Sequence, residues 1–223
     1  MKKAILISIK PEWVETILNG EQTIEIRKSM PKCDLPIDVY IYCTKGKDLL
    51  RQVSCYYPKQ KKRTFNYKII NEDYNTNKIV NGKVVAKFTL NKVEWVACED
   101  LGYRKIFFTE TKEDFSYVAN MTDDQLSDYF SNKQLKKGNV VGYAWHIENL
   151  QIFDKPMELN QFEKYYDEPD DLKPCCNGKH WIHESYDWCE NQSFCDIDYD
   201  GTNCPYLKVN KAPQSWQYVY IGD

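Results

Sequence analysis

The chain has 223 residues, a hydrophobic fraction of 42% and a formal net charge of -3 at pH 7. This size allows one large or two small domains with a real core. The near-neutral charge excludes a global basic field, so a nucleic-acid site has to be a local patch.

The first ten residues, MKKAILISIK, combine a basic start with an apolar stretch that ends at Lys10. That stretch is too short for a signal peptide, and no run of about eighteen apolar residues follows that would span a membrane. We therefore expect a cytoplasmic protein without a membrane partner. Within this start, AILISI (4–9) is typical of a short buried strand.

A helix and two strands are predicted next. KPEWVETILNG (10–20) begins with a proline that suits a first helical turn, and Gly20 suits a left-handed exit from the helix. QTIEIRK (22–28) and DVYIYCT (38–44) alternate as strands do. In the first of these strands, Glu25 and Arg27 therefore project from the same face.

The pattern then changes several times along the chain. Residues 45–80 are locally basic and rich in tyrosine, which indicates an insertion outside the core. KVVAKFTLNKVEWVA (83–97) is predicted as a strand, and residues 120–130 as a helix that starts with a capping box formed by Thr122 and Gln125. NVVGYAWHIENLQIF (139–153) is predicted as one long strand with a glycine at a bulge.

Too few helices alternate with these strands for a doubly wound parallel sheet. We therefore predict an α+β fold, in which a mixed β-barrel with short flanking helices fills residues 1–160. The remainder, 161–223, is predicted to be a cysteine-rich C-terminal extension whose last strand, at about 211–221, packs back on the barrel.

The helix followed by Gly20-x-x-Thr23-x-Glu25-x-Arg27 resembles the ASCH (activating signal cointegrator homology) family. ISIKPEW, VYIYCTKG, VVAKF, YAWHI and KAPQSWQYVY are similar to the phage and prophage branch of that family. The resemblance covers most of the first 155 residues and implies a PUA-like β-barrel, located in the host cytoplasm if the protein is phage-encoded. It also implies a polar, cationic cleft beside the first helix that receives RNA or a nucleotide.

The predicted ligand site lies in this cleft. Arg27 and the lysines suit phosphate, and Glu25 is suited to accept a hydrogen bond from a base amino group or to hold Arg27 in place. From the residues alone, an exposed ion pair worth under about 1 kcal/mol is the competing interpretation. The assigned ligand-binding residues are Lys10, Trp13, Glu25, Arg27, Lys28, Lys45, Trp145, Gln214, Ser215 and Trp216.

One branch of the family hydrolyses acetylated cytidine with a lysine, a threonine and a glutamate. Here Gln22 stands at the lysine position and Glu25 at the threonine position, while a loose alignment places Ala119 at the glutamate position. We therefore favour a binding module for RNA, a modified nucleoside or a nucleotide over an enzyme. A hydrolase of amidohydrolase or nuclease type with non-standard residues is the alternative.

The cysteine-rich segment offers a candidate structural zinc site, because thiolates suit tetrahedral zinc and the segment has few aliphatic residues. The assigned ligands are Cys176, Cys189, Cys195 and Cys204, at irregular spacing, with unligated thiols and a disulfide as alternatives. The same segment is strongly acidic, so a host protein is a weaker alternative partner.

The basic insertion is a further candidate for single-strand binding. Arg51, Arg63 and several lysines interleave with Tyr56, Tyr57, Phe65 and Tyr67. Cations that follow a backbone and rings that stack on bases are the components of such sites. The competing interpretation is a solvated loop or hairpin whose aromatic side chains anchor it to the barrel. His146 is interpreted as a structural histidine, because no catalytic triad can be assembled around it.

Overall fold

A computed structural model describes residues 2–57, 62–72, 77–111, 118–130, 135, 140–164 and 208–222, without the side chains of 55–57 and 62–64. The helices in this part are α1 (Pro11–Leu18) and α3 (Asp123–Tyr129), with a 3-10 turn η2 (Leu159–Gln161). The strands are β1 (Lys2–Ile9), β2 (Ile24–Arg27), β3 (Ile37–Cys43), β4 (Leu50–Tyr57), β5 (Lys62–Ile69), β6 (Lys78–Ile79), β7 (Val84–Leu90), β8 (Val93–Asp100), β9 (Lys105–Thr109), β10 (Val140–His146), β11 (Glu148–Met157), β12 (Phe162–Lys164) and β13 (Trp216–Ile221). The predicted α+β class, with a mixed sheet and short flanking helices, is confirmed.

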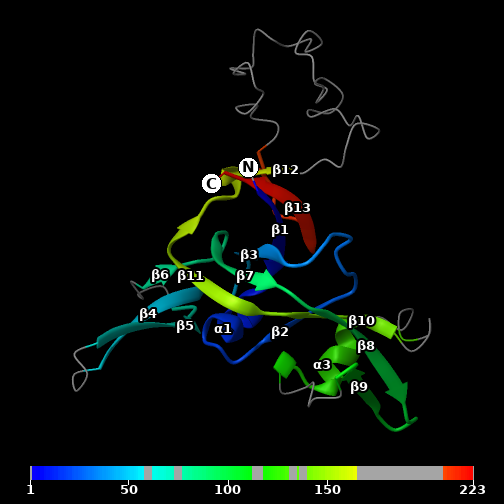
Figure 1. The fold of residues 1–223 in the computed structure, drawn as a ribbon. Coiled ribbons are helices and arrows are strands. Elements are labelled where there is room, and N and C mark those ends of the chain that lie inside the picture. Colours follow the sequence, from blue (N-terminus) through cyan, green and yellow to red (C-terminus); the bar gives the residue numbers. More distant parts are fainter. Residues whose placement is uncertain are drawn as a thin grey trace, which may run out of the picture.

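The largest sheet has six strands in the order β11-β7-β3-β1-β13-β12 and curls into an open half-barrel (Figure 1). Its central strand β1 runs parallel to β3 and antiparallel to β13. A parallel pair needs a crossover connection, and α1 with β2 supplies it. Because β13 pairs with β1, the two ends of the chain lie close together (Figure 1).

Strand β1 is buried on both faces, which explains its continuous apolar run. Ile5, Ile7 and Ile9 join the core under α1, whereas Ala4 and Leu6 face a second cluster on the opposite side of the sheet. Helix α1 closes the first of these cores with Val14, Ile17 and Leu18. The helix ends as predicted, since Gly20 takes a left-handed conformation with φ of 77°.

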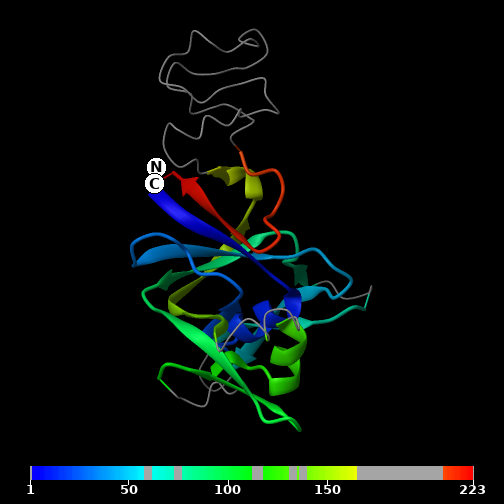
Figure 2. The same cartoon turned by 90° about the vertical axis from the view of Figure 1, so that its right-hand side faces the viewer.

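The second sheet has four strands in the order β2-β10-β8-β9, and α3 packs on it (Figure 1). The predicted capping box is confirmed, because the Thr122 hydroxyl accepts from the Gln125 backbone N–H and the Gln125 side chain accepts from the Thr122 N–H. The two sheets meet beside α1 (Figure 2). After α1 the chain turns at Gly20 and continues into β2, which belongs to the four-stranded sheet.

Two predicted long strands are wrong, because each divides between the two sheets. Residues 83–97 form β7 in the large sheet and β8 in the smaller one, and residues 139–153 divide between β10 and β11 at Ile147. Just beyond that division, Asn149 has φ of 50°, a left-handed conformation that turns the chain. The predicted glycine bulge is confirmed between Val140 and Gly142.

The prediction that the basic insertion lies outside the core is also wrong. Its strands β4, β5 and β6 form a three-stranded sheet, from which Leu50 and Tyr67 enter the main core. Asn19, just after α1, donates to the Tyr67 carbonyl at 2.9 Å and accepts from the Tyr67 N–H at 3.1 Å. These contacts fix the three-stranded sheet to the end of α1.

The cysteine-rich segment lies outside the described residues, apart from its return through Lys208 to β13. In the part of the chain that the structure describes, no helix is long and apolar enough to cross a membrane.

Candidate functional site

Glu25 and Arg27 form a buried ion pair on one face of β2. The Glu25 Oε1 and Arg27 Nη2 atoms lie 2.9 Å apart, and the two side chains are only 9% and 8% exposed. The alternation of β2 places both side chains on the same face, as the sequence predicts. The competing interpretation of an exposed surface pair is wrong, because both side chains are buried, and Arg27 contacts Ser8 of β1 and Ser215, which directly precedes β13.

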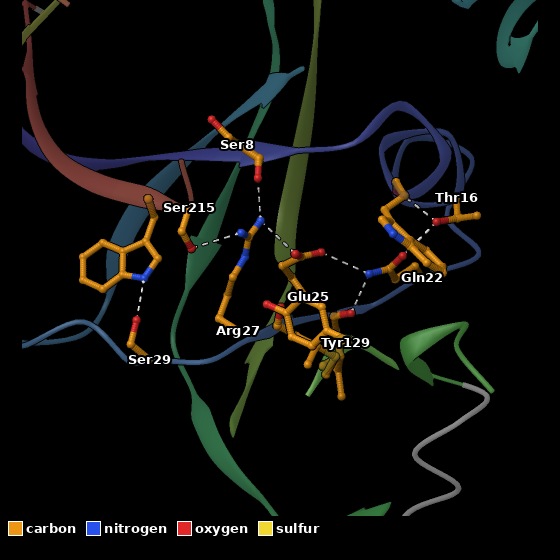
Figure 3. Close-up of polar contacts among 12 residues, drawn as sticks. Ser8, Thr16, Gln22, Glu25, Arg27, Ser29, Tyr129 and Ser215 are labelled. Atoms are coloured by element: carbon orange, nitrogen blue, oxygen red, sulfur yellow. Dashed lines mark hydrogen bonds and ion pairs between the residues drawn. The ribbon is translucent and has the colours of Figure 1, made fainter. Parts of the chain in front are cut away.

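Gln22 holds the carboxylate from the side of α1. Its Nε2 donates to Glu25 Oε2 at 3.2 Å and to the Ile24 carbonyl at 2.8 Å. Its Oε1 accepts from the hydroxyl of Thr16 on α1 at 2.8 Å (Figure 3). Each Glu25 oxygen therefore has a partner within the protein, and the role of accepting from a base amino group stays a prediction.

The guanidinium of Arg27 is held by two further parts of the chain. Nη2 donates to the Ser8 carbonyl on β1 at 2.8 Å, and Nη1 donates to Ser215 Oγ at 3.3 Å (Figure 3). Ser215 itself is placed by a 2.8 Å backbone bond from the Ser8 N–H to its carbonyl. The site therefore joins residues that are 188 positions apart in the sequence.

Burial raises the pKa of Glu25, while the charge of Arg27 and the hydrogen bonds from Arg27 and Gln22 oppose that rise. A buried ion pair usually gives little net stability, because desolvation of both charges offsets their attraction. A carboxylate with a perturbed pKa and a fixed guanidinium is typical of a functional site, although ion pairs in structural networks share this property.

Exposed lysines follow β1, β2 and β3. Lys10 follows Ser8 by two residues, and Lys28 follows Arg27 directly, with its Nζ 4.9 Å from the centre of the Tyr129 ring. Lys45 lies next to Thr44, whose N–H donates to the Ile9 carbonyl at the end of β1. All three lysines are exposed.

The three tryptophans assigned to the ligand site differ in burial and in their contacts. Trp145 is fully buried opposite Glu25 in the β2–β10 register, so its ring is not available for base stacking. Trp216 packs against it with ring centres 5.5 Å apart and donates from Nε1 to Ser29 Oγ at 3.1 Å. Trp13 is partly buried against the core under α1, and Gln214 is exposed before β13.

Two residues of the insertion, Arg51 and Tyr67, have structural roles. Arg51 is only 4% exposed and donates to the carbonyls of Ile70, Asn77 and Glu72, so it organises the loops of the three-stranded sheet instead of binding phosphate. Tyr67 is buried in the core, while Phe65 is 51% exposed. The side chains of Tyr56, Tyr57 and Arg63 lie outside the described part.

The positions that correspond to the amidohydrolase residues do not form a catalytic set. Gln22 holds Glu25, and Ala119 is buried in the apolar core beneath α3. Thr23 is exposed, and its backbone pairs with Val118 and Ile147. Cys43 is an inert thiol, because burial raises its pKa to about 12.

A carboxylate–histidine pair that the sequence did not reveal lies on the opposite face of the smaller sheet. Glu94 of β8 shares a hydrogen bond with His146 Nε2 of β10, and Lys92 Nζ lies 3.3 Å from Glu94 Oε1. The Thr111 N–H also donates to Oε1, at 3.1 Å. The signal was the spacing of two polar residues inside apolar strands, but only the strand register brings them together.

The stability of the folded protein should depend on pH through Glu94. Burial raises its pKa, but hydrogen bonds and charges from His146 and Lys92 outweigh burial, so the pKa lies below its ordinary value of 4.5. A carboxyl with a depressed folded-state pKa contributes stability above its unfolded pKa and loses it as pH falls through the folded pKa. We expect Glu94→Gln to lower the free energy of unfolding by about 1 to 2 kcal/mol at pH 7.

Urea unfolding of Glu94→Gln and wild type at pH 7 and at pH 3 measures this effect, with the exposed Glu110→Gln as the control. The difference between Glu94→Gln and wild type should shrink at pH 3. A difference of the same size at both pH values would show that packing, and not the ionised carboxylate, is responsible.

No group of three or more potential metal ligands gathers among the residues that the structure describes. The predicted ligands Cys176, Cys189, Cys195 and Cys204 lie outside this part, so the structural zinc stays a prediction. Cys33, Cys43 and Cys98 are free thiols, and each packs in or against a hydrophobic core, as small apolar residues do.

No protein-family model matches the chain, and no curated protein matches it at a significant level. Among solved structures, it is similar to the crystal structure of ASCH from Zymomonas mobilis, with 17% identity and a TM-score of 0.40, over 71% of this chain and 75% of that chain. One single-residue variant of that protein matches with 17% identity and a TM-score of 0.41, over 72% and 78% of the two chains. Another matches with 18% identity and a TM-score of 0.39, over 71% and 75%.

Proposed function

We propose that the protein is a binding module for RNA or a nucleotide, and that the ligand contacts the region of Arg27 and the lysines around it. The observation that carries this proposal is the buried guanidinium, which partners from β1, β2 and the start of β13 hold in one orientation. Such a fixed, planar donor suits phosphate and base oxygens better than a mobile surface cation does.

The charge around Arg27 supports the same function. The Glu25–Arg27 pair is neutral as a whole, so electrostatic attraction for a phosphate backbone has to come from Lys10, Lys28 and Lys45. These lysines follow β2, which carries the pair, β1, whose Ser8 carbonyl accepts from Arg27, and β3, which pairs with β1. The sequence resemblance of Gly20-x-x-Thr23-x-Glu25-x-Arg27 to the ASCH family also favours an RNA or nucleotide ligand.

The combined substitution of Lys10, Lys28 and Lys45 by alanine is expected to weaken binding of a single-stranded RNA and to reduce its salt dependence. Each lost phosphate contact should make the slope of log affinity against log salt less steep by about 0.7, so three contacts account for about 2. Fluorescence anisotropy at several salt concentrations measures both quantities.

A matched triple variant of Lys78, Lys155 and Lys164, all exposed and distant in sequence from the pair, serves as the control. It removes the same formal charge from other surfaces. If both triple variants lose affinity equally, the binding is a property of net charge and not of this site.

Purified protein is expected to show no deacetylation of acetylcytidine, because Gln22 cannot act as an acid or base and both Glu25 oxygens are engaged. Chromatographic analysis of acetylcytidine incubated with wild type and with Glu25→Gln tests this expectation. Turnover in the wild type that disappears in Glu25→Gln would favour the alternative function, a hydrolase with a rearranged set of groups.

A further inference from the structure

One face of the four-stranded sheet carries aromatic side chains on the side away from α3. Val96 of β8 and Phe107 of β9 belong to the core beneath α3. Because side chains alternate along a strand, Trp95 and Phe108 lie on the opposite face. Their ring centres are 6.1 Å apart, and neither ring belongs to a hydrophobic core of the described residues. The two rings therefore do not serve to fill a core.

The strand register extends these rings into a row that ends at Arg27. Trp95 lies opposite Tyr143 of β10, and Tyr143 lies opposite Arg27 of β2. Directly opposite residues share a face of the sheet, and neighbouring strands are about 4.8 Å apart. The side chains of this aromatic row, in order from β9 to β2, are Phe108, Trp95, Tyr143 and Arg27.

The outer part of this sheet face is open to solvent. Trp95 is 36% exposed, and Val140, which lies opposite Ala97 on the same face, is 49% exposed. Phe108 and Tyr143 are half-buried. A contiguous exposed apolar surface on a soluble protein usually marks a binding site. Aromatic rings on an open sheet face are the arrangement with which proteins stack unpaired bases.

Charges at the two ends of the row give the ligand a direction. Glu99 of β8 and Glu110, directly after β9, are exposed carboxylates at one end. At the other end, exposed Lys28 follows Arg27 at the end of the outer strand β2. A nucleotide has a negative phosphate on one side and base amino groups, which carboxylates accept, on the other. The phosphates are therefore expected toward β2, and the bases over β10 and β8.

We propose that the aromatic row binds single-stranded RNA, with unpaired bases stacked on Trp95 and Tyr143 and the phosphate backbone toward Arg27 and Lys28. This inference rests on the proposed function and specifies its ligand as an unpaired strand. In a duplex the bases stack on one another, so their faces are not available to the rings. Neither Trp95 nor Tyr143 is among the ligand-binding residues assigned from the sequence.

Fluorescence anisotropy of a labelled single-stranded RNA with the full-length protein tests the proposal. Trp95→Ala should weaken binding by about 5- to 150-fold, the effect of one lost stacking contact. Trp95→Phe, which keeps a ring at this position, should retain most of the affinity. Phe65→Ala, at a 51% exposed ring on β5, is the matched control and should bind as wild type does.

Two further readouts separate stacking from attraction by charge. The slope of log affinity against log salt should stay the same in Trp95→Ala, because no phosphate contact is lost, whereas the substitution of Lys10, Lys28 and Lys45 makes it less steep. The same RNA annealed to its complement should bind Trp95→Ala and wild type equally. If Trp95→Ala does not fold, Val140→Glu provides the test, since a carboxylate on the same open face should also weaken binding of the single strand.

The outcomes separate this inference from the proposed function. If single-stranded RNA binds and the triple lysine substitution weakens it, but Trp95→Ala and Val140→Glu bind as tightly as wild type, the inference alone is overturned. It is also overturned if sedimentation shows a wild-type dimer that Trp95→Ala dissociates without a change in RNA affinity, because the aromatic row is then an interface between copies. If no RNA binds to the wild type, the proposed function is wrong and the inference fails with it.

Discussion

Arg27→Ala is expected to lower the free energy of unfolding by about 3 to 5 kcal/mol, because it leaves the buried Glu25 carboxylate without its counter-charge. At an exposed pair the same substitution would change binding and leave stability almost untouched. Denaturant unfolding monitored by tryptophan fluorescence measures the loss. Arg104→Ala, at an exposed arginine, is the matched control and should stay within about 0.5 kcal/mol of wild type.

The double variant Glu25→Gln/Arg27→Ala shows whether the uncompensated charge is the cause. It should be more stable than Arg27→Ala alone, since no ionised group is left buried.

The dependence of stability on pH also shows whether the uncompensated charge of Glu25 is the cause. Burial raises the folded-state pKa of Glu25 above 4.5. A carboxyl with a raised folded-state pKa lowers the stability of the protein as the pH rises above its unfolded pKa. Removal of Arg27 should steepen that decline, and an unchanged pH profile would contradict the ion-pair explanation.

Gly142→Ala is expected to destabilise the protein by about 3 kcal/mol, at the upper end of overpacking costs. A Cβ atom at this position would lie 2.4 Å from Phe130 Cε1 and 2.8 Å from the carbonyl oxygen of Arg27. The first contact is with a ring in the core beneath α3, and the second is with the backbone of the paired strand β2. Phe130 is fully buried and the Arg27 carbonyl is backbone, so neither moves away as cheaply as the end of a flexible side chain would.

Thermal unfolding of Gly142→Ala beside Gly46→Ala measures this effect, because a Cβ at Gly46 meets no atom within 4 Å. Gly142→Ala/Phe130→Leu should recover part of the loss by removing the ring contact, but not the contact with the Arg27 carbonyl. If the two alanine variants are equally stable, β10 does not approach β2 as closely as the structure shows. Because the displaced carbonyl belongs to Arg27, Gly142→Ala should also weaken ligand binding.

Local rules were sufficient for the elements whose signals lie within a few residues. The helix from Pro11 to Leu18 has a proline at its start and a left-handed glycine after it, and the capping box at Thr122 marks the start of α3. Each depends on the conformational preferences of single residues and on hydrogen bonds within one turn. The pairing of Glu25 with Arg27 also followed from the two-residue period of a strand.

Strand ends and sheet membership were not predictable in this way. Residues 83–97 were predicted as one strand but divide between β7 and β8, and the division at Ile147 has no proline or glycine to mark it. The chain changes sheets at these points because its backbone finds partners on different strands. That pairing is non-local, so no pattern within a short window contains it.

The sequence by itself determined the α+β class, the first helix and the placement of Glu25 and Arg27 on one strand face, because these depend on propensity and periodicity along a short stretch of chain. Only the tertiary structure decided that this pair is buried, that Gln22 and Ser215 hold it, and that Glu94 contacts His146. Burial and long-range hydrogen bonds arise when strands distant in the sequence pack together, and Arg27 and Ser215 are 188 residues apart. The exposure of a charged residue on an alternating strand is set by what covers that strand, which the strand's own residues do not encode.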